Sequence, residues 1–371
     1  MSEALPPIYF YLPESDRLRG HLPTDIETSW QWQVTEGRPR FGVSEDEYAW
    51  NLQTYLRLKD SGFPCEMTAT FPTDGIVLTG REHLPFDLRP NPKLLIICLQ
   101  ADKSPHPYAQ LHVVQNPRAL YTELTLHGDY HFPQVKRVAS QPFADRYFMR
   151  HWTQPGLIPR SLDRGDCFEK AAYFGYGAFL TPEMINGSWQ AQVEALGLQW
   201  QFKSRTQALD GWTNYSDVDV VVAVRGFDRH VDYSWKPATK LYNAWYAGVP
   251  AILGCESAYQ AERQSDLDYL EVTSLDEVVI ALKRLRDDPA LRQAMRENGL
   301  RRAEAVKPAK TVEQWQTFLK TVAIPTYDRW RTASTWGRQA FLQRRHFAVQ
   351  ASAIKRFVNF KIEGIQRRLK G

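Results

Sequence analysis

The segment Lys236–Leu253, KPATKLYNAWYAGVPAIL, places two cations where a helix begins. Pro237 is typical of a first helical position and Gly248 of the left-handed residue that ends a helix, so a helix is predicted between them. The partial positive charge of a helix N-terminus favours acids, yet this turn carries Lys236 and Lys240 and no acid. A bound phosphate resolves that conflict, so the segment predicts a phosphate-binding site.

A third cation is expected at the same place. The apolar run Val218–Val224 is the strongest strand pattern of the chain and is followed by Arg225. A short loop, 227–235, then leads into the lysine segment, and two phosphates match three converging cations. The alternative is that these are solvated surface charges, paired with Asp228 or Asp232; the dipole argument favours the phosphate.

A glycine turn follows another predicted strand, Ala171–Phe174. Gly175, Tyr176 and Gly177 resemble half of a dinucleotide-binding fingerprint, although Leu180 stands where a third glycine belongs. Such a turn lets a ligand approach the backbone closely. An ordinary turn accounts for the same residues equally well.

Candidate proton acceptors lie in two loops of the N-terminal half. Glu82 and His83 follow the apolar run Gly75–Thr79, and Asp102 and His106 follow the run Leu94–Leu99. A carboxylate or imidazole at a strand end could act as general base for an acceptor hydroxyl. The alternative for each is a surface residue of a loop.

The elements that would position these residues alternate between strand and helix. Strands are predicted at Ile8–Leu12, Cys65–Thr70, Gly75–Thr79, Leu94–Leu99, Leu111–Val114, Ala171–Phe174, Leu198–Lys203, Val218–Val224, Val249–Leu253 and Tyr269–Val272. Helices are predicted at Ser44–Leu58, Glu183–Leu196, Leu275–Arg286, Leu291–Val306 and Val312–Val322. Alternation of this kind predicts an α/β fold of doubly wound parallel sheets.

A length of 371 residues exceeds what one hydrophobic core usually supports. We place a linker in the Pro-, Gly- and Arg-rich stretch Arg150–Asp166, which lacks periodicity. The predicted division is a Rossmann-like domain at 1–155, a second Rossmann-like domain at 156–324, and a helical return with a tail at 325–371. Strand C-termini of the two sheets are expected to face one cleft, where ligands of such sheets bind.

Composition narrows the cellular setting. The four cysteines are far apart and match no metal spacing, which favours a reducing compartment. The first residues lack the basic and apolar regions of a signal peptide, and no apolar run has the length of a membrane span. We therefore expect a cytoplasmic protein. The net charge of +4 is too small to predict nucleic-acid binding.

The charge is concentrated in the C-terminal tail. From Thr335 to Gly371 nine Lys or Arg oppose the single acid Glu363. Apolar residues recur there every three or four positions, at Phe347, Ala351, Ile354, Val358, Ile362, Ile365 and Leu369. This pattern predicts a basic amphipathic helix, which suits the anionic inner face of a membrane. The alternative is that the stripe packs on this protein or on a second subunit.

The lysine segment resembles the donor-binding segment of GT-B-fold glycosyltransferases, including fucosyltransferase-like and exostosin-like members. The similarity extends over roughly Lys170–Val322. It implies two Rossmann-like domains around a cleft, a nucleotide sugar held on the C-terminal one, and no required metal or other cofactor. Glutamates stand seven and fifteen residues before the proline in the commonest retaining members; this chain has Asn243 and Trp235 there.

The resemblance also assigns roles. Lys240 would contact the diphosphate, Arg225 would support leaving-group charge, and Asn243 could bond a ribose hydroxyl. The donor-binding residues it implies are Gly175, Tyr176, Gly177, Arg225, Lys236, Thr239, Lys240 and Asn243. The expected activity is transfer of a hexose from a nucleotide diphosphate to a hydroxyl of a glycan or lipid-linked acceptor, with the base among Asp102, His106, His83 and Glu82. A sugar-nucleotide 2-epimerase and a non-catalytic nucleotide- or sugar-binding protein are the alternatives.

Overall fold

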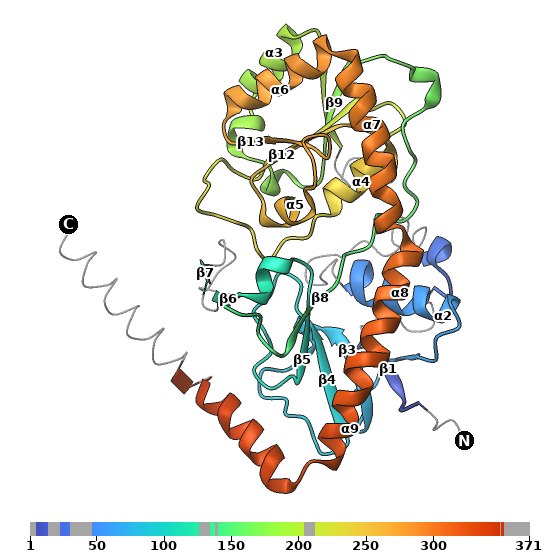
Figure 1. Ribbon diagram of the computed structural model, residues 1–371, viewed down its shortest axis with the longest axis vertical. Coiled ribbons are helices and arrows are strands. Elements are labelled where there is room, and N and C mark those ends of the chain that lie inside the picture. The colour runs from blue at the N-terminus through green and yellow to red at the C-terminus, as the bar shows by residue number, and fades with distance from the viewer. Residues whose placement is uncertain are drawn as a thin grey trace, which may run out of the picture.

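Two parallel sheets organise the molecule into an upper and a lower domain (Figure 1). The computed structural model describes residues 5–13, 23–29, 47–125, 134–137, 140–203, 212–348 and 350–351. The lower domain contains the first sheet, and the upper domain contains the second. The predicted α/β class is confirmed, and the domain boundaries given above stay a prediction.

The first sheet has the strand order β2-β1-β3-β4-β5-β8, with every neighbouring pair parallel. Its strands are β1 Ile8–Tyr11, β2 Glu66–Thr68, β3 Gly75–Gly80, β4 Leu94–Leu99, β5 Leu111–Val114 and β8 Arg146–Phe148. Residues of β3 and β4 are buried at every position, as expected for strands covered on both faces. The strand β8 had no counterpart in the sequence prediction, nor did the antiparallel pair β6 Thr122–Thr125 and β7 Gln134–Arg137.

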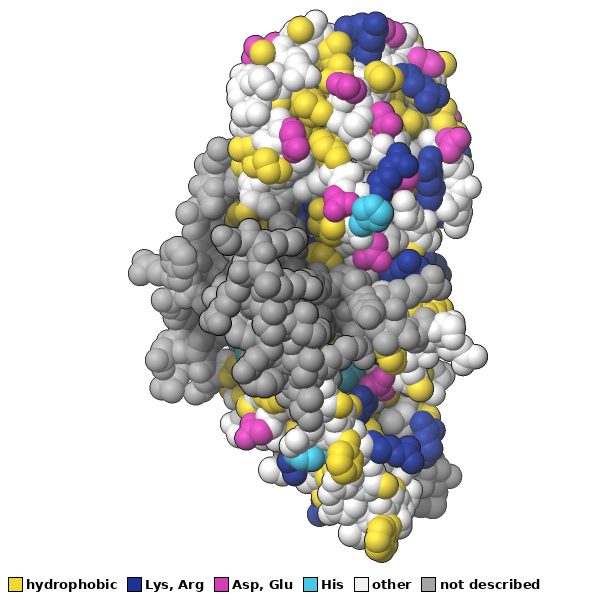
Figure 2. Space-filling model, turned by 90° about the vertical axis from the view of Figure 1, so that its left-hand side faces the viewer, with side chains coloured by type: hydrophobic (Ala, Val, Ile, Leu, Met, Phe, Trp, Pro, Cys, Tyr) yellow, Lys and Arg dark blue, Asp and Glu magenta, His cyan; other side chains and the backbone are white. Residues whose placement is uncertain are grey.

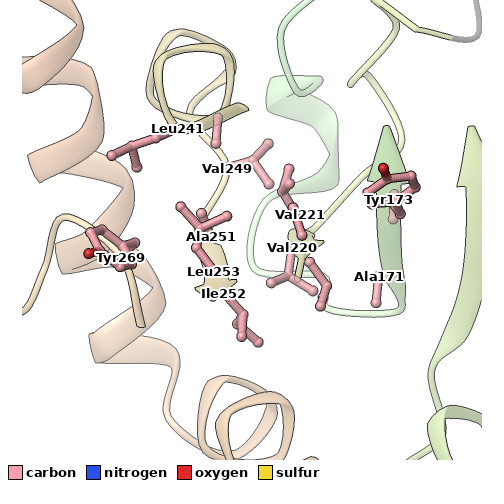
Figure 3. Packing of buried hydrophobic residues seen from close by; sticks show 14 of the residues in the cluster. Ala171, Tyr173, Val220, Val221, Leu241, Val249, Ala251, Ile252, Leu253 and Tyr269 are labelled. Carbon is pink, nitrogen blue, oxygen red and sulfur yellow. The ribbon is translucent and has the colours of Figure 1, made fainter. Parts of the chain in front are cut away.

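The second sheet has the order β10-β9-β11-β12-β13 and is also parallel throughout. Its strands are β9 Lys170–Phe174, β10 Gln199–Lys203, β11 Val220–Ala223, β12 Ala251–Gly254 and β13 Leu270–Val272. Side chains of β11 and β12 pack with Leu241 and Tyr269 in one buried cluster (Figure 3). Each of these strands was predicted, with ends that differ by one or two residues.

The helices surround these sheets. They are α2 Gln53–Asp60, α3 Gly187–Ala195, α4 Thr239–Ala247, α5 Ser257–Glu262, α6 Leu275–Asp287, α7 Pro289–Ala303, α8 Pro308–Phe318 and α9 Ile324–Thr332. The predicted helix at Ser44–Leu58 is in part a π-helical segment, Glu47–Leu52, which precedes α2. The helix α3 begins four residues later than predicted because Asn186 caps it, accepting from Trp189 N.

The lysine helix also begins later than predicted. Ala238 has φ −83° and ψ 22°, outside the helical region, so α4 starts at Thr239 rather than at Pro237. Lys236 therefore lies in the preceding loop, while Lys240 remains in the first turn. Gly248 has φ 65°, the left-handed ending that was predicted.

The end of the chain returns to the lower domain. Trp315 and Phe318 of α8, with Tyr327 of α9, belong to the hydrophobic core of the first sheet (Figure 1). A helix over 335–348 follows and contacts that domain, with Arg345 bonded to Asp145. Within the described residues, no helix is long and apolar enough to cross a bilayer. Most of the predicted basic tail, 352–371, lies outside the described residues.

The surface carries mixed charge. On the face drawn in Figure 2, acidic and basic side chains alternate over the upper domain without a continuous basic stripe.

Candidate functional site

A cleft of about 190 Å³ lies between the two domains. The carboxyl ends of strands from both sheets meet at this cleft, as predicted for two parallel sheets whose strands end at one ligand-binding site. The residues that line it are Ala49, Asp102, Gln115, His151, Gln154, Phe174, Gly175, Tyr176, Phe179, Trp212, Tyr215, Arg225, Lys236, Pro237, Thr239, Lys240 and Asn243. Seven of the eight predicted donor-binding residues therefore line the cleft, and Gly177 is the one that does not.

Lys240 is the cation that the fold leaves facing the cleft without a carboxylate partner among the described residues. Its Nζ lies 5.2 Å from the centre of the Tyr173 ring. The pKa of Lys240 is lowered to about 7, mainly by burial and also by the nearby charges of Arg225 and Lys236, against the opposing effect of Glu256. A bound anion would restore the charged form of this ammonium group.

Gly175 makes room for Lys240. This residue directly follows β9 at the cleft and has φ 149°, a conformation that favours glycine. A Cβ at this position would lie 2.8 Å from the Tyr173 hydroxyl and 3.1 Å from Lys240 Nζ. Gly177 differs, because its nearest neighbour would be Phe202 at an ordinary 3.6 Å. Only the first glycine of the predicted turn is thus required by the site.

The first turn of α4 adds hydrogen-bond donors. No side chain caps this helix, and its first turn holds no acid. The backbone N–H groups of this turn therefore remain available as donors at the positive end of the helix dipole. The hydroxyl of Thr239 is buried at this turn without a hydrogen-bond partner. Together with Lys240, these groups form a cradle of donors at the cleft wall.

Arg225 is held differently from the prediction. Its Nε donates to Glu256 Oε2 at 2.9 Å, and the Glu256 side chain is only 2% exposed. The partner is therefore neither of the two aspartates considered from the sequence, because Glu256 follows the neighbouring strand β12. Arg225 still lines the cleft, where Glu256 fixes its position and offsets most of its charge.

Lys236 reaches across to the other domain. Its Nζ donates to Asp102 Oδ2, and Gln115 Nε2 donates to the second oxygen, Oδ1, at 2.9 Å. The same Lys236 ammonium lies 4.5 Å from the centre of the Phe179 ring. An ion pair between domains was not foreseen, since Lys236 was predicted to face a phosphate at the N-terminus of the helix.

Aromatic side chains form the neighbouring wall. Tyr176 meets Trp212 edge to face at 5.3 Å and Phe179 at 6.4 Å between ring centres. Phe179 is 40% exposed. A wall of this kind suits a flat heteroaromatic ring, which gains from stacking and from the nearby cations.

Asn243 is committed to a structural contact. Its Oδ1 accepts from the backbone N–H of Gln154 at 3.0 Å, and the residue is 7% exposed. This bond ties α4 to the segment that connects the sheets. The carbonyl oxygen of the side chain is thus engaged, although the residue lines the cleft.

Of the four predicted bases, Asp102 is the one placed at the cleft. His106 is fully buried: its Nδ1 accepts from the backbone of Tyr108 and Ala109, and its Nε2 donates to Pro85 O at 2.8 Å. Burial lowers the pKa of His106 to about 4. This imidazole has a structural position, because both nitrogens are used within its own domain.

The two remaining candidates also lie away from the cleft lining. His83 contacts the Tyr11 ring edge to face, with ring centres 6.4 Å apart. The carboxylate of Glu82 folds back over Gly80, where an added Cβ would meet it at 2.9 Å. The strand end that carries them is therefore at the correct edge of the sheet, but the side chains turn away.

His151 is a cleft residue that the sequence prediction missed. Its Nδ1 donates to Trp152 O at 3.2 Å, which leaves Nε2 with the lone pair of the neutral ring. Burial lowers the pKa of His151, and the charge of Asp102 opposes that shift. The residue lies in the stretch treated as a linker, where no periodicity marked it.

Within the part of the chain that the structure describes, no group of three or more His, Cys, Asp or Glu side chains is placed to hold a metal ion. The arrangement instead offers nitrogen and hydroxyl donors on one side of the cleft and a carboxylate with a neutral imidazole on the other. These groups can bind an anion and accept a proton, respectively.

No protein-family model matches the sequence, and a search of curated proteins found no significant match. Among solved structures, Anabaena Alr3699/HepE in complex with UDP and glucose aligns over 85% of this chain and 100% of its own, at 9% identity and a TM-score of 0.46. The pneumococcal O-GlcNAc transferase GtfA, with UDP and GlcNAc, aligns over 74% and 60%, at 12% identity and a TM-score of 0.43. Sucrose-phosphate synthase from Thermosynechococcus elongatus aligns over 78% and 82%, at 14% identity and a TM-score of 0.40. These similarities are low.

Proposed function

We propose that this protein is a glycosyltransferase that moves a hexose from a nucleotide diphosphate to an acceptor hydroxyl. The observation that carries the proposal is the cradle of Lys240, the Thr239 hydroxyl and the first N–H groups of α4, which faces a cleft between two parallel sheets. A diphosphate supplies the negative charge that this cradle lacks. The aromatic wall beside it suits the nucleobase.

The chemistry follows from charge. In transfer with inversion, the acceptor oxygen forms a bond to the anomeric carbon, and its proton moves to a base. The bond from that carbon to the diphosphate breaks, and the electron pair stays on the leaving diphosphate. Cations fixed at that point stabilise the transition state more than the ground state, because the charge grows as the bond breaks.

Asp102 is our proposed base, and His151 is the second candidate. Both line the same cleft as the cradle, Asp102 after strand β4 and His151 after strand β8 of the lower domain. Asp102→Asn and His151→Gln separate them: the base should lose roughly 10²–10⁴-fold in turnover, while the other variant keeps most of its activity. Equal, small losses in both variants would exclude the pair.

Calorimetry against UDP, GDP and dTDP tests the donor site. We expect at least one nucleoside diphosphate to bind, and the matching nucleotide sugar to be hydrolysed slowly without an acceptor. No binding of any of the three would overturn the proposal. No metal or other cofactor is proposed, and binding should persist in EDTA.

Two alternatives give different products. A sugar-nucleotide 2-epimerase would convert the donor to its epimer without any acceptor, which product analysis by NMR detects. A non-catalytic binding protein would bind the nucleotide sugar and leave it intact with every acceptor, glycan or lipid-linked. Release of the free sugar favours the transferase over both.

We further propose that the protein acts in the cytoplasm at the inner face of a membrane, where a lipid-linked acceptor would be accessible. Two large aromatic residues of the helix over 335–348 are exposed, Trp336 by 86% and Phe347 by 68%. They are eleven residues apart, about three helical turns, and so share one face. Phe347 also begins the apolar stripe predicted for the basic tail, and exposed aromatics flanked by arginine suit an anionic lipid surface.

Vesicle sedimentation tests the membrane proposal. The full chain should bind phosphatidylglycerol vesicles, should bind less in high salt, and should not bind neutral phosphatidylcholine. A chain ending at Ser334 should lose binding, and Trp336→Ser with Phe347→Ser should weaken it. Equal sedimentation of the shortened chain would refute the role of this helix.

A further inference from the structure

An ion pair between Lys236 of the upper domain and Asp102 of the lower domain joins the two domains at the cleft. Lys236, whose side chain is 13% exposed, donates to Asp102, whose side chain is 28% exposed. Gln115 strengthens the junction, because its Nε2 donates both to Asp102 Oδ1 at 2.9 Å and across the domains to Trp235 O at 2.8 Å. A cation of the proposed nucleotide-sugar site and the carboxylate proposed as the base thus neutralise each other.

The backbone on both sides of this pair is strained. Among the described residues, Ala101 and Tyr233 are the non-glycine residues with left-handed φ, at 44° and 48°. Ala101 directly precedes Asp102, and Tyr233 begins the turn in which Lys236 N donates to Tyr233 O at 2.8 Å. Such conformations are unfavourable for residues with a Cβ and persist where the surrounding structure enforces them. The fold therefore presents both partners of the pair on enforced turns.

A diphosphate in the cradle conflicts with this pair. Lys236 and Lys240 both line the cleft, so phosphates bound to Lys240 come close to Lys236 as well. The Asp102 carboxylate already bonded to Lys236 offsets the cation and repels a second anion beside it. Binding of the donor then requires Lys236 to exchange one anionic partner for the other.

We propose that Asp102 and Lys236 form a donor-operated switch, in which the diphosphate takes Lys236 and thereby releases Asp102 to the acceptor. This inference rests on the proposed function. Before the exchange, the lone pairs of Asp102 Oδ2 are engaged by the ammonium group and cannot accept the acceptor proton. After the exchange, Gln115 still holds Oδ1 and orients the freed oxygen toward the cleft. Donor binding thus precedes activation of the acceptor hydroxyl.

The switch makes an unusual prediction for Asp102→Asn. A neutral amide no longer competes for Lys236, so UDP or GDP should bind about tenfold more tightly by calorimetry, while transfer falls by roughly 10²-fold or more. An ion pair with a merely structural role predicts the opposite sign, because its loss loosens the cleft and weakens nucleotide binding.

Asp232→Asn is the matched control. Asp232 accepts from Arg118 Nε at 3.2 Å across the same two domains but does not line the cleft. Like Asp102→Asn, this variant removes one acid and one ion pair between domains. Because Asp232 does not line the cleft, nucleotide affinity and turnover should stay within about twofold of the unchanged protein. A gain equal to that of Asp102→Asn would assign the effect to general electrostatics and overturn the switch.

A double variant isolates the pair. In a Lys236→Ala background, Asp102→Asn should change nucleotide affinity by about twofold at most, because the competition is already absent. An undiminished tenfold gain there would overturn the exchange. Failure of the switch is distinguishable from failure of the proposed function: nucleotide binding by the unchanged protein with equal or weaker binding by Asp102→Asn defeats the switch alone, whereas no nucleotide binding by the unchanged protein defeats both.

Discussion

The strands β10-β9-β11-β12-β13 follow the same spatial order as β2-β1-β3-β4-β5, and both sets end at one cleft, but with different side chains. The upper sheet contributes Arg225, and the adjoining loop and helix contribute Lys236 and Lys240. The lower sheet and the segment after it contribute Asp102, Gln115 and His151. One topology thus positions the cationic half-site and the half-site that we propose accepts the proton, so topology specifies where chemistry occurs and the loop residues specify which chemistry.

The largest effect should come from removing the central cation of the upper half-site. Lys240→Ala deletes the ammonium group that faces the cleft without a carboxylate partner among the described residues. We expect kcat/KM for transfer to fall by about 10²–10³-fold, as for loss of a preorganised group that stabilises developing charge. Lys310→Ala, at an exposed lysine paired with Glu313, is the control and should leave kinetics unchanged. Unchanged turnover in Lys240→Ala would remove the upper half-site from the mechanism.

A smaller loss is expected at the glycine that makes room for Lys240. Gly175→Ala places a methyl group 2.8 Å from the Tyr173 hydroxyl and 3.1 Å from Lys240 Nζ, at a φ of 149°. Nucleotide affinity measured by calorimetry should fall by roughly 10–100-fold. Gly177→Ala is matched to it, since the added methyl group meets only ordinary contacts, and the affinity should be retained. Equal effects of the two variants would mean that the turn, rather than the space beside Lys240, matters.

Affinity for the nucleotide sugar should also depend on pH. The pKa of Lys240 is about 7, below its ordinary value, so the group is charged below pH 7 and increasingly neutral above it. A diphosphate binds the charged form, so affinity should fall by about fivefold between pH 7 and pH 8, with proton uptake on binding. Calorimetry in buffers of different ionisation enthalpy measures that uptake.

Lys240→Arg tests the origin of the pH dependence. Arginine stays charged throughout this range, so the variant should bind with an affinity that is nearly independent of pH. A nucleotide sugar is the suitable ligand, because its diphosphate has no proton to lose between pH 6 and pH 9. The same slope in both proteins would place the titrating group elsewhere.

Local patterns were sufficient to predict every strand of the second sheet and all but β8 of the first, and to mark the lysines that line the cleft. The apolar run at β11 and the glycine at 248 mark their elements by composition alone, and the lysines follow from their spacing. The pairings that decide their roles were not predictable. Arg225 bonds Glu256, thirty-one positions away, and Lys236 bonds Asp102 in the other domain, because both contacts depend on how strands are ordered in space. His151 lies in a segment without periodicity, where no pattern could mark it.

Gln115 gives the smallest expected effect and the sharpest test of how the half-sites are joined. Its side-chain amide donates one hydrogen bond to Asp102 and one to the Trp235 carbonyl, and the residue is 5% exposed. Gln115→Ala leaves both acceptors short of a partner, which costs about 1–3 kcal/mol and should lower the thermal midpoint by a few degrees. Gln316→Ala, which removes an exposed bond to Ser61, should leave the midpoint unchanged. Gln115→Ala also removes a hydrogen bond that orients Asp102, so kcat should fall several-fold while nucleotide affinity stays the same. An unchanged thermal midpoint would show that this amide contributes little to the contact between the domains.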